Sequence, residues 1–299
     1  MRIRTWFFLA FFFLILLFIL FYDTGFLQKS QIDKRDLARW NYNNSLIEGN
    51  DMFILNGSKQ SCWILIHGYT STPDEMKELG EKINLEFGDY VVAPRLLGHS
   101  EVPSKVLNLS FNDWYWQLNT EFNSLSHDCK KINIVGSSLG GTIALNLAEE
   151  EQANNLYLVD LYLHAPYHFY YIFKPETSMR LLSNILHYIK KHKTSSINDP
   201  VGEKNHKAYL NFPLDPIVNS QKNIKQIEEN LYKIDENTYI QHSINDDTSS
   251  VKSSKLVYEK IASKNKSIIF FSRSNHVLLR DYDKDEVINN IIKFERENR

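Results

Sequence analysis

The chain has 299 residues, 43% of them hydrophobic, and a formal net charge of -2 at pH 7. Its length and hydrophobic content are compatible with a single α/β domain around a large core. A near-neutral charge without basic clusters excludes a general affinity for nucleic acid. Neither a Gly-rich phosphate loop nor a Cys/His metal spacing occurs, so we expect no cofactor and no metal. Nothing in the sequence predicts the oligomeric state.

The N-terminal residues predict a membrane anchor. No charged residue interrupts the stretch from Thr5 to Tyr22, and as a helix it would span roughly 27 Å, about the thickness of a bilayer core. A cleaved signal peptide would have a shorter apolar region and a small-residue cleavage site. We therefore expect a transmembrane helix over residues 1–22. A polar tether over residues 23–50 follows, helical in part between Ile32 and Trp40.

The charges flanking this segment favour one orientation without fixing it. Arg2 and Arg4 favour a cytoplasmic N-terminus, but basic residues also follow the segment, Lys29 and Lys34 among them. Long C-terminal domains are translocated largely regardless of charge. We expect the rest of the chain to lie in the periplasm or another extracytoplasmic space.

From residue 51 onward, apolar runs alternate with helical patterns. The expected strands are Met52–Leu55, Trp63–His67, Tyr90–Ala93, Ile132–Gly136, Leu156–His164, Thr238–His242 and Ser267–Phe271. The expected helices are Asp74–Phe87, Phe111–Leu125, Leu139–Glu150, Val251–Ser263 and Asp285–Glu297. Apolar strands separated by helices predict an α/β fold with a mostly parallel sheet covered on both faces. Functional side chains in such sheets collect at the carboxyl ends of the strands.

The sequence Gly136-Ser137-Ser138-Leu139-Gly140 lies where an expected strand meets an expected helix. In a Gly-x-Ser-x-Gly turn the middle serine stands on a strained backbone, and the small flanking residues avoid clashes. The alternative is an ordinary packing turn. Because strand, turn and helix are in the register that the motif needs, Ser138 is the predicted nucleophile and Ser137 a spacer.

A serine nucleophile requires a base, and the base requires an acid that orients it. In this arrangement the chain order is serine, acid, histidine. The chain has ten histidines, and His276 is the one in a short loop after the last expected strand. His242 ends a strand but precedes the acid candidates. His276 is therefore the predicted base.

Two carboxylates follow the expected strand Thr238–His242. Asp246 is the preferred acid because it is the first carboxylate after the strand, and Asp247 remains an alternative. Either could instead cap the helix expected from Val251.

Acyl transfer also requires hydrogen-bond donors for the developing oxyanion. One donor is the backbone N–H that follows the nucleophile, here Leu139. The loop after the strand Trp63–His67 supplies the second, because Gly68 permits a sharp turn that frees the N–H of Tyr69. His67 is expected to orient this loop.

Five segments resemble, in order and spacing, the bacterial carboxylesterases and monoacylglycerol lipases of the α/β-hydrolase superfamily. They are HGYTSTPDEMKEL, VVAPRLLGHSEVP, NDWYWQL, VGSSLGG and RSNHVLL. The resemblance covers about Ser61 to Phe294. It implies the α/β-hydrolase fold and these site residues: Ser138 as nucleophile, Asp246 as acid, His276 as base, and Tyr69 and Leu139 as oxyanion donors.

The chain departs from the family pattern at three serines. Ser71 and Ser100 replace glycines, and Ser249 stands three positions after Asp246, where an apolar residue is common. The last departure leaves the choice of acid open. None of the three removes a reacting group.

The resemblance further implies a small helical lid at about residues 167–235 within a hydrolase domain of residues 51–299. The aromatic run from Tyr167 to Phe173 belongs either to the core or to the wall of an acyl pocket. We expect a membrane-anchored serine hydrolase for small-molecule or lipid esters, of short or medium chain or monoacylglycerol-like. The same triad would serve amide cleavage or acyl transfer. A non-catalytic anchored binding domain is a further alternative.

The only two cysteines, Cys62 and Cys129, lie at or just before the starts of two expected strands. The resemblance implies that these strands are neighbours, which would put both cysteines at the amino-terminal edge of the sheet, within reach of a disulfide. The alternative is two independent buried thiols. A bridge would suit a domain in an oxidising compartment.

Overall fold

The computed structural model describes residues 2–24, 32–166, 180, 183, 186–191 and 195–299, with side chains in the first helix described for residues 6–17. Within these residues, a sheet of seven strands has the order β11-β10-β7-β6-β4-β5-β3. In chain order its strands are β3 (Phe53–Leu55), β4 (Ser58–Ile66), β5 (Asp89–Ala93), β6 (Ile132–Ser137), β7 (Asn155–Val159), β10 (Asn237–Ser243) and β11 (Lys266–Phe271). Only β3 is antiparallel to its neighbour, so the sheet is mostly parallel, as predicted.

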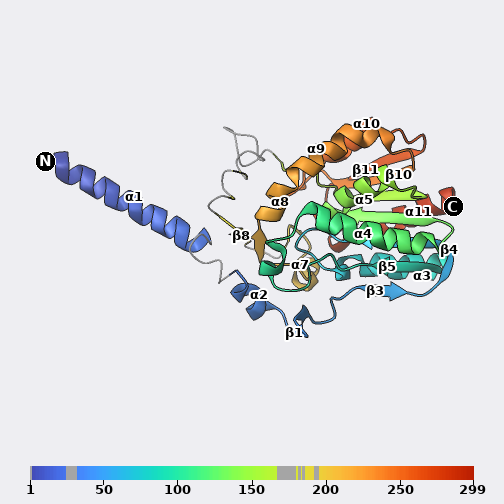
Figure 1. The fold of residues 1–299 in the computed structure, drawn as a ribbon, viewed down its shortest axis with the longest axis horizontal. Helices are drawn as coiled ribbons and strands as arrows, with labels where there is room; N and C mark the ends of the chain where they lie inside the picture. Colours follow the sequence, from blue (N-terminus) through green and yellow to red (C-terminus); the bar gives the residue numbers. More distant parts are fainter. Residues whose placement is uncertain (1, 25–31, 167–179, 181–182, 184–185, 192–194) are drawn as a thin grey trace.

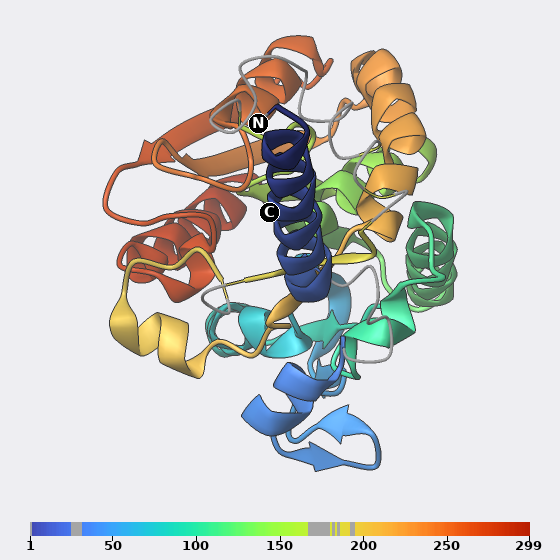
Figure 2. The same ribbon diagram turned by 90° about the vertical axis from the view of Figure 1, so that its left-hand side faces the viewer.

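Helices cover both faces of this sheet (Figures 1 and 2). The main ones are α3 (Lys77–Phe87), α4 (Phe111–Ser126), α5 (Leu139–Glu150), α9 (Gln221–Asn230), α10 (Val251–Lys260) and α11 (Lys284–Asn298). Short 3-10 helices are η2 (Pro73–Met76), η3 (Pro103–Val106), η5 (Leu231–Lys233) and η6 (Leu278–Arg280).

Successive side chains of a strand point to opposite faces, and this alternation divides the core in two. Ile64 and Ile134 belong to the cluster that packs under α4, α5, α9 and α10. Leu65 and Val135, the next residue in each strand, belong to the cluster under α3 and α11. A sheet that is buried on both faces is rigid, and its carboxyl edge therefore provides a fixed platform for a site.

The strand predicted from Leu156 to His164 ends earlier than expected, at Val159. Asp160 has φ 46°, a left-handed conformation that ends the extended run. Leu161 and Leu163 remain fully buried beyond this turn, which explains why the sequence pattern alone extended the strand.

The N-terminal segment forms helix α1 (Arg2–Thr24), which stands apart from the sheet and its helices (Figure 1). Over the part of the chain that the structure describes, no helix is both long and apolar enough to cross a membrane. The structure therefore does not support the transmembrane helix expected at residues 1–22.

Residues 32–50, expected as the second half of a tether, fold against the rest of the protein; we call them the N-terminal strap. They contain α2 (Lys34–Arg39) and a small ribbon of β1 (Tyr42–Asn43) and β2 (Leu46–Ile47). Ile32 is buried against Leu107 and Tyr188. Asp33 accepts hydrogen bonds from the backbone N–H and the hydroxyl of Ser104. Residues 32–50 are therefore not a free linker.

The region between β7 and β10, expected as a helical lid, also contains strands. β8 (Tyr188–Lys190) pairs antiparallel with β9 (Asn211–Pro213), and the helices are α7 (Pro200–Asn205), α8 (Asp215–Asn219) and α9. The strands β8 and β9 therefore form where a helical lid was expected. α9 packs on α5 in the core. The aromatic run from Tyr167 to Phe173 lies outside the described residues.

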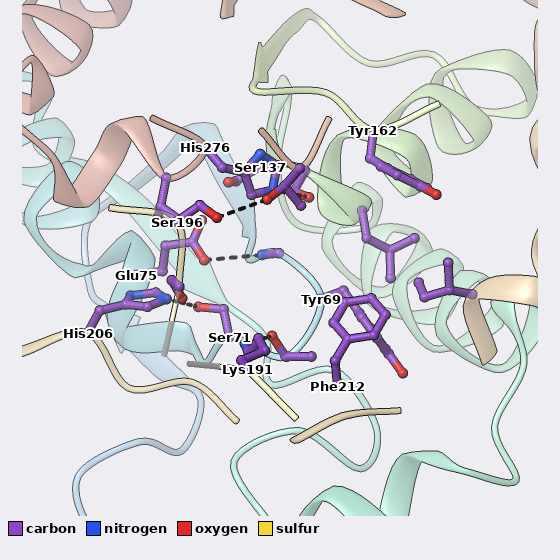
Figure 3. Close-up of a pocket in the computed structure, with 18 of the residues that line it drawn as sticks. Tyr69, Ser71, Glu75, Ser137, Tyr162, Lys191, Ser196, His206, Phe212 and His276 are labelled. Atoms are coloured by element: carbon purple, nitrogen blue, oxygen red, sulfur yellow. Dashed lines mark hydrogen bonds between the residues drawn. The ribbon is translucent and has the colours of Figure 1, made fainter. Parts of the chain in front are cut away.

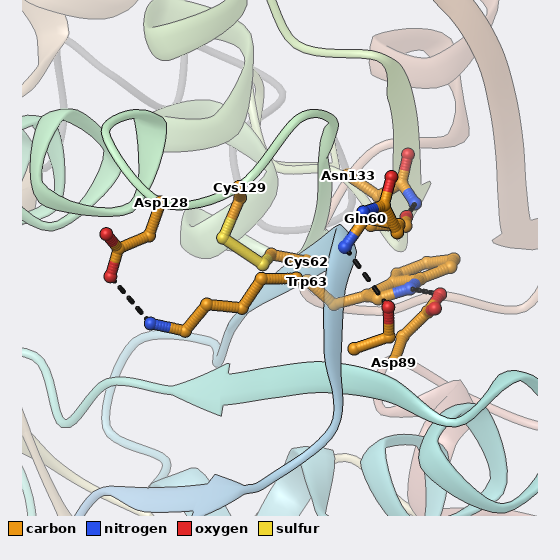
Figure 4. Close-up of a disulfide and its surroundings, with 10 residues drawn as sticks. Gln60, Cys62, Trp63, Asp89, Asp128, Cys129 and Asn133 are labelled. Carbon is orange, nitrogen blue, oxygen red and sulfur yellow. Dashed lines mark hydrogen bonds and ion pairs between the residues drawn. A yellow bond between two sulfur atoms is a disulfide. The ribbon is translucent and has the colours of Figure 1, made fainter.

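Cys62 and Cys129 form a disulfide with a Cα–Cα distance of 6.0 Å (Figure 4). Cys62 pairs in register with Ile132, so the bridge joins β4 to the segment that leads into β6 where the pairing of the two strands begins. The bridge that the resemblance implied is confirmed. It lies at the opposite edge of the sheet from the strand ends that carry Ser138, Asp246 and His276.

Candidate active site

Ser138 stands at the turn between β6 and α5 with φ 52° and ψ -119°, a strained conformation for a residue with a side chain. The neighbouring glycines make the turn possible. A Cβ on Gly136 would lie 2.4 Å from the carbonyl oxygen of Gly140, and one on Gly140 would lie 2.3 Å from that of Ile66. The tight packing of the turn and the strained backbone of the middle serine therefore arise from the same motif.

A chain of hydrogen bonds joins Ser138, His276 and Asp246. The Nε2 atom of His276 is 2.9 Å from the Ser138 hydroxyl oxygen, and its Nδ1 atom is 2.7 Å from Oδ2 of Asp246. The three side chains come from the segments that follow β6, β10 and β11. The structure thus brings together the three residues predicted from the sequence.

Asp246 and Asp247 have different environments, which separates the two acid candidates. Oδ1 of Asp246 accepts the backbone N–H groups of Thr248 (2.8 Å) and Ser249 (2.7 Å), which fixes the carboxylate against His276. Asp247 is exposed and exchanges hydrogen bonds with Asn275. Only Asp246 contacts the imidazole.

Charges at the triad favour an ionised Asp246 and a protonated His276. Burial opposes ionisation of Asp246, but the imidazoles of His276 and His242 hold its pKa well below the usual range. Burial likewise opposes a charge on His276, yet the Asp246 carboxylate raises the pKa of His276 to about 9. The carboxylate therefore strengthens the imidazole as a proton acceptor.

Two buried residues behind the triad were not predicted. Nε2 of His242 is 3.2 Å from Oδ2 of Asp246, and its Nδ1 is 2.6 Å from the hydroxyl of Ser254. Asp160 accepts the N–H groups of Ser243 and Leu278. Burial and the nearby charge of Asp246 raise the pKa of Asp160, which favours its neutral form.

The ligand atoms of Asp160, His242 and Asp246 lie within 4.8 Å of one another, as in some metal sites. Backbone N–H groups already bind the Asp160 carboxyl, and His276 binds Asp246. Hydrogen bonding among these residues thus accounts for the cluster.

Tyr69 and Leu139, the predicted oxyanion donors, lie in segments next to Ser138. A Cβ on Gly68 would lie 3.2 Å from the Ser138 Cβ, so the loop after β4 passes close to Ser138. Within the described part of the chain, neither N–H donates to a protein acceptor. His67 binds the Gly68 carbonyl through Nδ1 and the Leu96 N–H through Nε2, which holds the loop in place.

A cavity of about 170 Å³ lies against Ser138 and His276. Figure 3 shows that its two sides differ in chemistry. The apolar wall consists of Tyr69, Leu139, Tyr162, Ala165, Phe212 and Ile217. The polar wall consists of Ser71, Glu75, Lys191, Ser196, His206 and Thr248.

Sequence comparison finds curated relatives of this chain, two of them from Bacillus, and no family model matches it. A carboxylesterase of Bacillus subtilis (strain 168) is 24% identical over 233 residues, which are 77% of this chain and 90% of the relative. A thermostable monoacylglycerol lipase of Bacillus sp. (strain H-257) is 25% identical over 232 residues, 77% of this chain and 88% of the relative.

Solved structures match over most of their length. One of two metagenome-derived lipolytic enzymes, LipS and LipT, superposes with a TM-score of 0.75 at 21% identity, covering 84% of this chain and 99% of that one. The monoglyceride lipase of Saccharomyces cerevisiae has a TM-score of 0.68 at 17% identity, covering 85% and 93%. The chain has the α/β-hydrolase fold.

The site residues that sequence analysis missed belong mostly to the polar wall. Glu75 comes from η2, Lys191 follows β8 and His206 follows α7. No spacing in the sequence connects them, because they meet only when the region between β7 and β10 folds over the loop after β4. Of these three residues, only Glu75 lies close in sequence to a predicted part of the site, since it follows the loop after β4.

Proposed function

We propose that this protein is a serine hydrolase of carboxylic esters. The observation that carries the proposal is the continuous hydrogen-bond chain from Ser138 through His276 to Asp246 beside two free backbone N–H groups. The similarity to a carboxylesterase and a monoacylglycerol lipase gives independent support.

In the first half of the reaction, His276 takes the proton of the Ser138 hydroxyl as its oxygen attacks the ester carbonyl carbon. The N–H groups of Tyr69 and Leu139 bind the resulting oxyanion. As the carbon–oxygen bond to the alcohol breaks, His276 gives its proton to the departing oxygen. In the second half, water attacks the acyl-enzyme with His276 again as base, and the acid and free Ser138 are released.

The cavity limits the substrate. A volume of about 170 Å³ suits a small acyl group, and the apolar wall favours a hydrocarbon chain over a charged one. We therefore propose esters of short or medium acyl chain, including monoacylglycerol-like lipids.

A fluorophosphonate probe tests this function directly, because it reacts only with an activated serine. Labelling should occur at Ser138 and should be slowed by p-nitrophenyl esters that the protein hydrolyses, when their concentrations approach or exceed their KM values. A chain-length series of these esters should show highest kcat/KM at short or medium length. An unlabelled protein that hydrolyses no ester of the series would refute the proposal in favour of a binding function.

We also propose that α1 binds a lipid bilayer through its apolar side chains, with the hydrolase domain outside the cytoplasm. Large apolar side chains along α1 are exposed, including Phe7 at 76% and Phe12 at 67%, and exposure of this extent is costly in water. The disulfide is of a kind that persists in oxidising compartments.

Fractionation tests the anchor. The full chain should remain with membranes through high-salt and carbonate washing, and a variant that lacks residues 1–24 should be soluble and active. A full chain found in the soluble fraction would contradict the anchor. Thiol counting on denatured, unreduced protein from its natural host tests the compartment, where two free thiols would contradict the extracytoplasmic location.

A further inference from the structure

Two side chains of the polar wall are buried with a polar atom left unpaired. Glu75 is 3% exposed and His206 is 1% exposed, and both line the cavity. Among the residues that the structure describes, neither Oε1 of Glu75 nor Nδ1 of His206 has a hydrogen-bond partner. Buried polar atoms are nearly always paired, and an exception calls for a functional explanation.

The carboxylate of Glu75 lies very near the nucleophile. Its Oε2 accepts the N–H of Gly68 at 3.3 Å, which ties the side chain to the oxyanion loop. A Cβ on Gly68 would lie 3.2 Å from the Ser138 Cβ and 3.6 Å from Oε2 of Glu75. Serine and carboxylate therefore flank the same point of the backbone, and Oε1 of Glu75 has no partner among the described residues at the wall of the cavity.

Glu75 is charged, and no cation of the described residues forms an ion pair with it. Burial by itself would raise the pKa of Glu75, but hydrogen bonds from the hydroxyls of Ser137 and Ser71, and the charge that His206 carries at low pH, lower it. Burial lowers the pKa of His206 to about 4, so this imidazole is neutral near pH 7. A buried negative charge beside the oxyanion hole opposes the reaction of a neutral ester unless the substrate compensates for it.

The other ionisable group of the polar wall interacts elsewhere. The ammonium of Lys191 donates to the Thr70 hydroxyl at 3.1 Å, and the Asp36 carboxylate attracts it. Burial lowers the pKa of Lys191 to about 7, so this amine is mostly neutral at mildly alkaline pH. In its neutral form, the Lys191 amine competes little with a bound cation for the Glu75 carboxylate.

The polar wall lies on the side where the alcohol part of an ester must sit. His276 protonates the departing alcohol, which therefore stays beside Nε2. The polar wall continues to His276, since the backbone N–H of His276 donates to the Ser196 carbonyl at 3.0 Å. The Thr248 hydroxyl in turn donates to that of Ser196 at 3.1 Å. The apolar wall, which suits the acyl chain, lies across the cavity (Figure 3).

We propose that Glu75 and His206 form an alcohol subsite that selects esters whose alcohol part carries a protonated amine. The inference rests on ester hydrolysis at Ser138 as proposed above. The N–H of the ammonium donates to Oε1 of Glu75, and the buried negative charge gains its missing partner. With its Nε2–H directed to the Ser71 hydroxyl, His206 offers Nδ1 as a second acceptor for an amine with more than one N–H.

Two butyrate esters of the same shape provide the test. Dimethylaminopropyl butyrate is protonated at mildly alkaline pH, and isohexyl butyrate has carbon in place of the nitrogen. We expect kcat/KM to be roughly 10–100-fold higher for the amine ester, the range of a hydrogen bond to a charged group. Hydroxypropyl butyrate, a neutral donor, should fall between the two.

The variant Glu75→Gln keeps the size of the side chain and removes its charge. The ratio of kcat/KM between amine ester and isohexyl ester should then fall to near one, whatever happens to the absolute rates. Glu78→Gln is the matched control, because Glu78 is on α3 outside the cavity and pairs with Arg280 and Lys284. In Glu78→Gln, the ratio of kcat/KM between the amine ester and the isohexyl ester should equal that of the wild type. Thermal unfolding and fluorophosphonate labelling verify that each variant is folded.

The outcomes separate this inference from the function on which it rests. Hydrolysis of isohexyl butyrate without preference for the amine ester would overturn the subsite and leave ester hydrolysis standing. An equal ratio in wild type and Glu75→Gln would overturn the role of Glu75. A hydroxypropyl ester as good as the amine ester would overturn the selection of a cation. Failure to hydrolyse any of the three esters would count against both proposals.

Discussion

The catalytic edge of the sheet and the segments that cover it are held in place by different kinds of contact. At the catalytic edge, backbone N–H groups from loops next to the strand ends hold Asp246 and Asp160. In the cover, the ribbon of β8 and β9 is held by side chains of the N-terminal strap. Oδ1 of Asp36 accepts the Leu210 N–H at 2.6 Å, and the Arg35 guanidinium donates to the Lys191 carbonyl at 2.9 Å.

The difference indicates which changes each region tolerates. The loops at the catalytic edge are fixed by a buried sheet, so a substitution there removes a chemical group without moving its neighbours. The strap and the ribbon depend on a few buried polar side chains, so loss of one of them shifts part of the cavity wall. Changes at the edge should therefore act on kcat, and changes in the cover should act on KM.

The largest effect is expected at the nucleophile. Ser138→Ala should lower ester turnover by a factor on the order of 10³–10⁶, because no other hydroxyl contacts Nε2 of His276 in the described residues. Ser137→Ala is the matched control and should lose far less. Steady-state kinetics with a p-nitrophenyl ester measures both. Greater loss in Ser137→Ala than in Ser138→Ala would show that the nucleophile is misassigned.

A smaller loss is expected at the acid. Asp246→Asn should lower kcat by a factor on the order of 10²–10⁴, while Asp247→Asn should have little effect. The pH profile gives a second measurement. Because only neutral His276 accepts the serine proton, kcat/KM should rise with pH through the neutral range toward the raised pKa of about 9.

Removing the carboxylate removes the interaction that raises the pKa of His276. The rising limb of the profile should therefore move to lower pH in Asp246→Asn and stay in place in Asp247→Asn. Equal, small effects of both substitutions would indicate an acid elsewhere in the chain.

In the cover, Asp36→Ala removes buried hydrogen bonds that contribute about 1–3 kcal/mol. Because the ribbon then shifts part of the cavity wall, KM should rise by roughly threefold to tenfold. The substitution leaves the Leu210 N–H and the Asn211 amide without their carboxylate partner. Asp33→Ala in the same strap is the control, since Asp33 binds Ser104 rather than the ribbon. Both substitutions should lower the midpoint temperature of thermal unfolding, because each removes hydrogen bonds of the strap. An equal change of KM in the two variants would show that the contact of Asp36 with the ribbon does not determine the shape of the cavity wall.

The smallest effect on activity is expected from reduction of the disulfide. The chain-entropy estimate for a loop of this length is about 4 kcal/mol of unfolding free energy, as an upper figure. Because the bridge lies at the far edge of the sheet, the folded enzyme should keep its kcat when reduced. Urea unfolding with and without reductant, together with an activity assay, tests both statements. Loss of activity in reduced protein that is still folded would contradict this prediction, because it would show that the disulfide affects the opposite edge of the sheet.

Sequence patterns predicted the sheet and the turn at Ser138 because both are local. The apolar runs coincide with the strands, and the glycines around Ser138 are required by contacts within a few residues or with the next strand. The strand end at Val159 was misjudged because burial continues past the turn at Asp160. The strap was misjudged for the opposite reason. Its polar residues resemble a linker, but Asp36 finds partners 174 residues away.

The choice between Asp246 and Asp247 illustrates the same limit within the site. Both carboxylates follow the same strand, and only the backbone N–H groups that bind Asp246 distinguish them. The polar wall could not be predicted from the sequence. Glu75 and His206 become neighbours only when the region between β7 and β10 folds over the loop after β4, and no periodic pattern in the sequence predicts how that region folds.

The disulfide also determines how the protein would respond to proteolytic nicking. The closed loop from Cys62 to Cys129 contains the oxyanion loop and Glu75, whereas Ser138, Asp246 and His276 lie outside it. A protease that cut once within this loop, for instance beside exposed Leu97, would therefore leave every piece of the active site in one covalent molecule. Such a nicked enzyme would migrate as a single species without reductant and as two fragments with it.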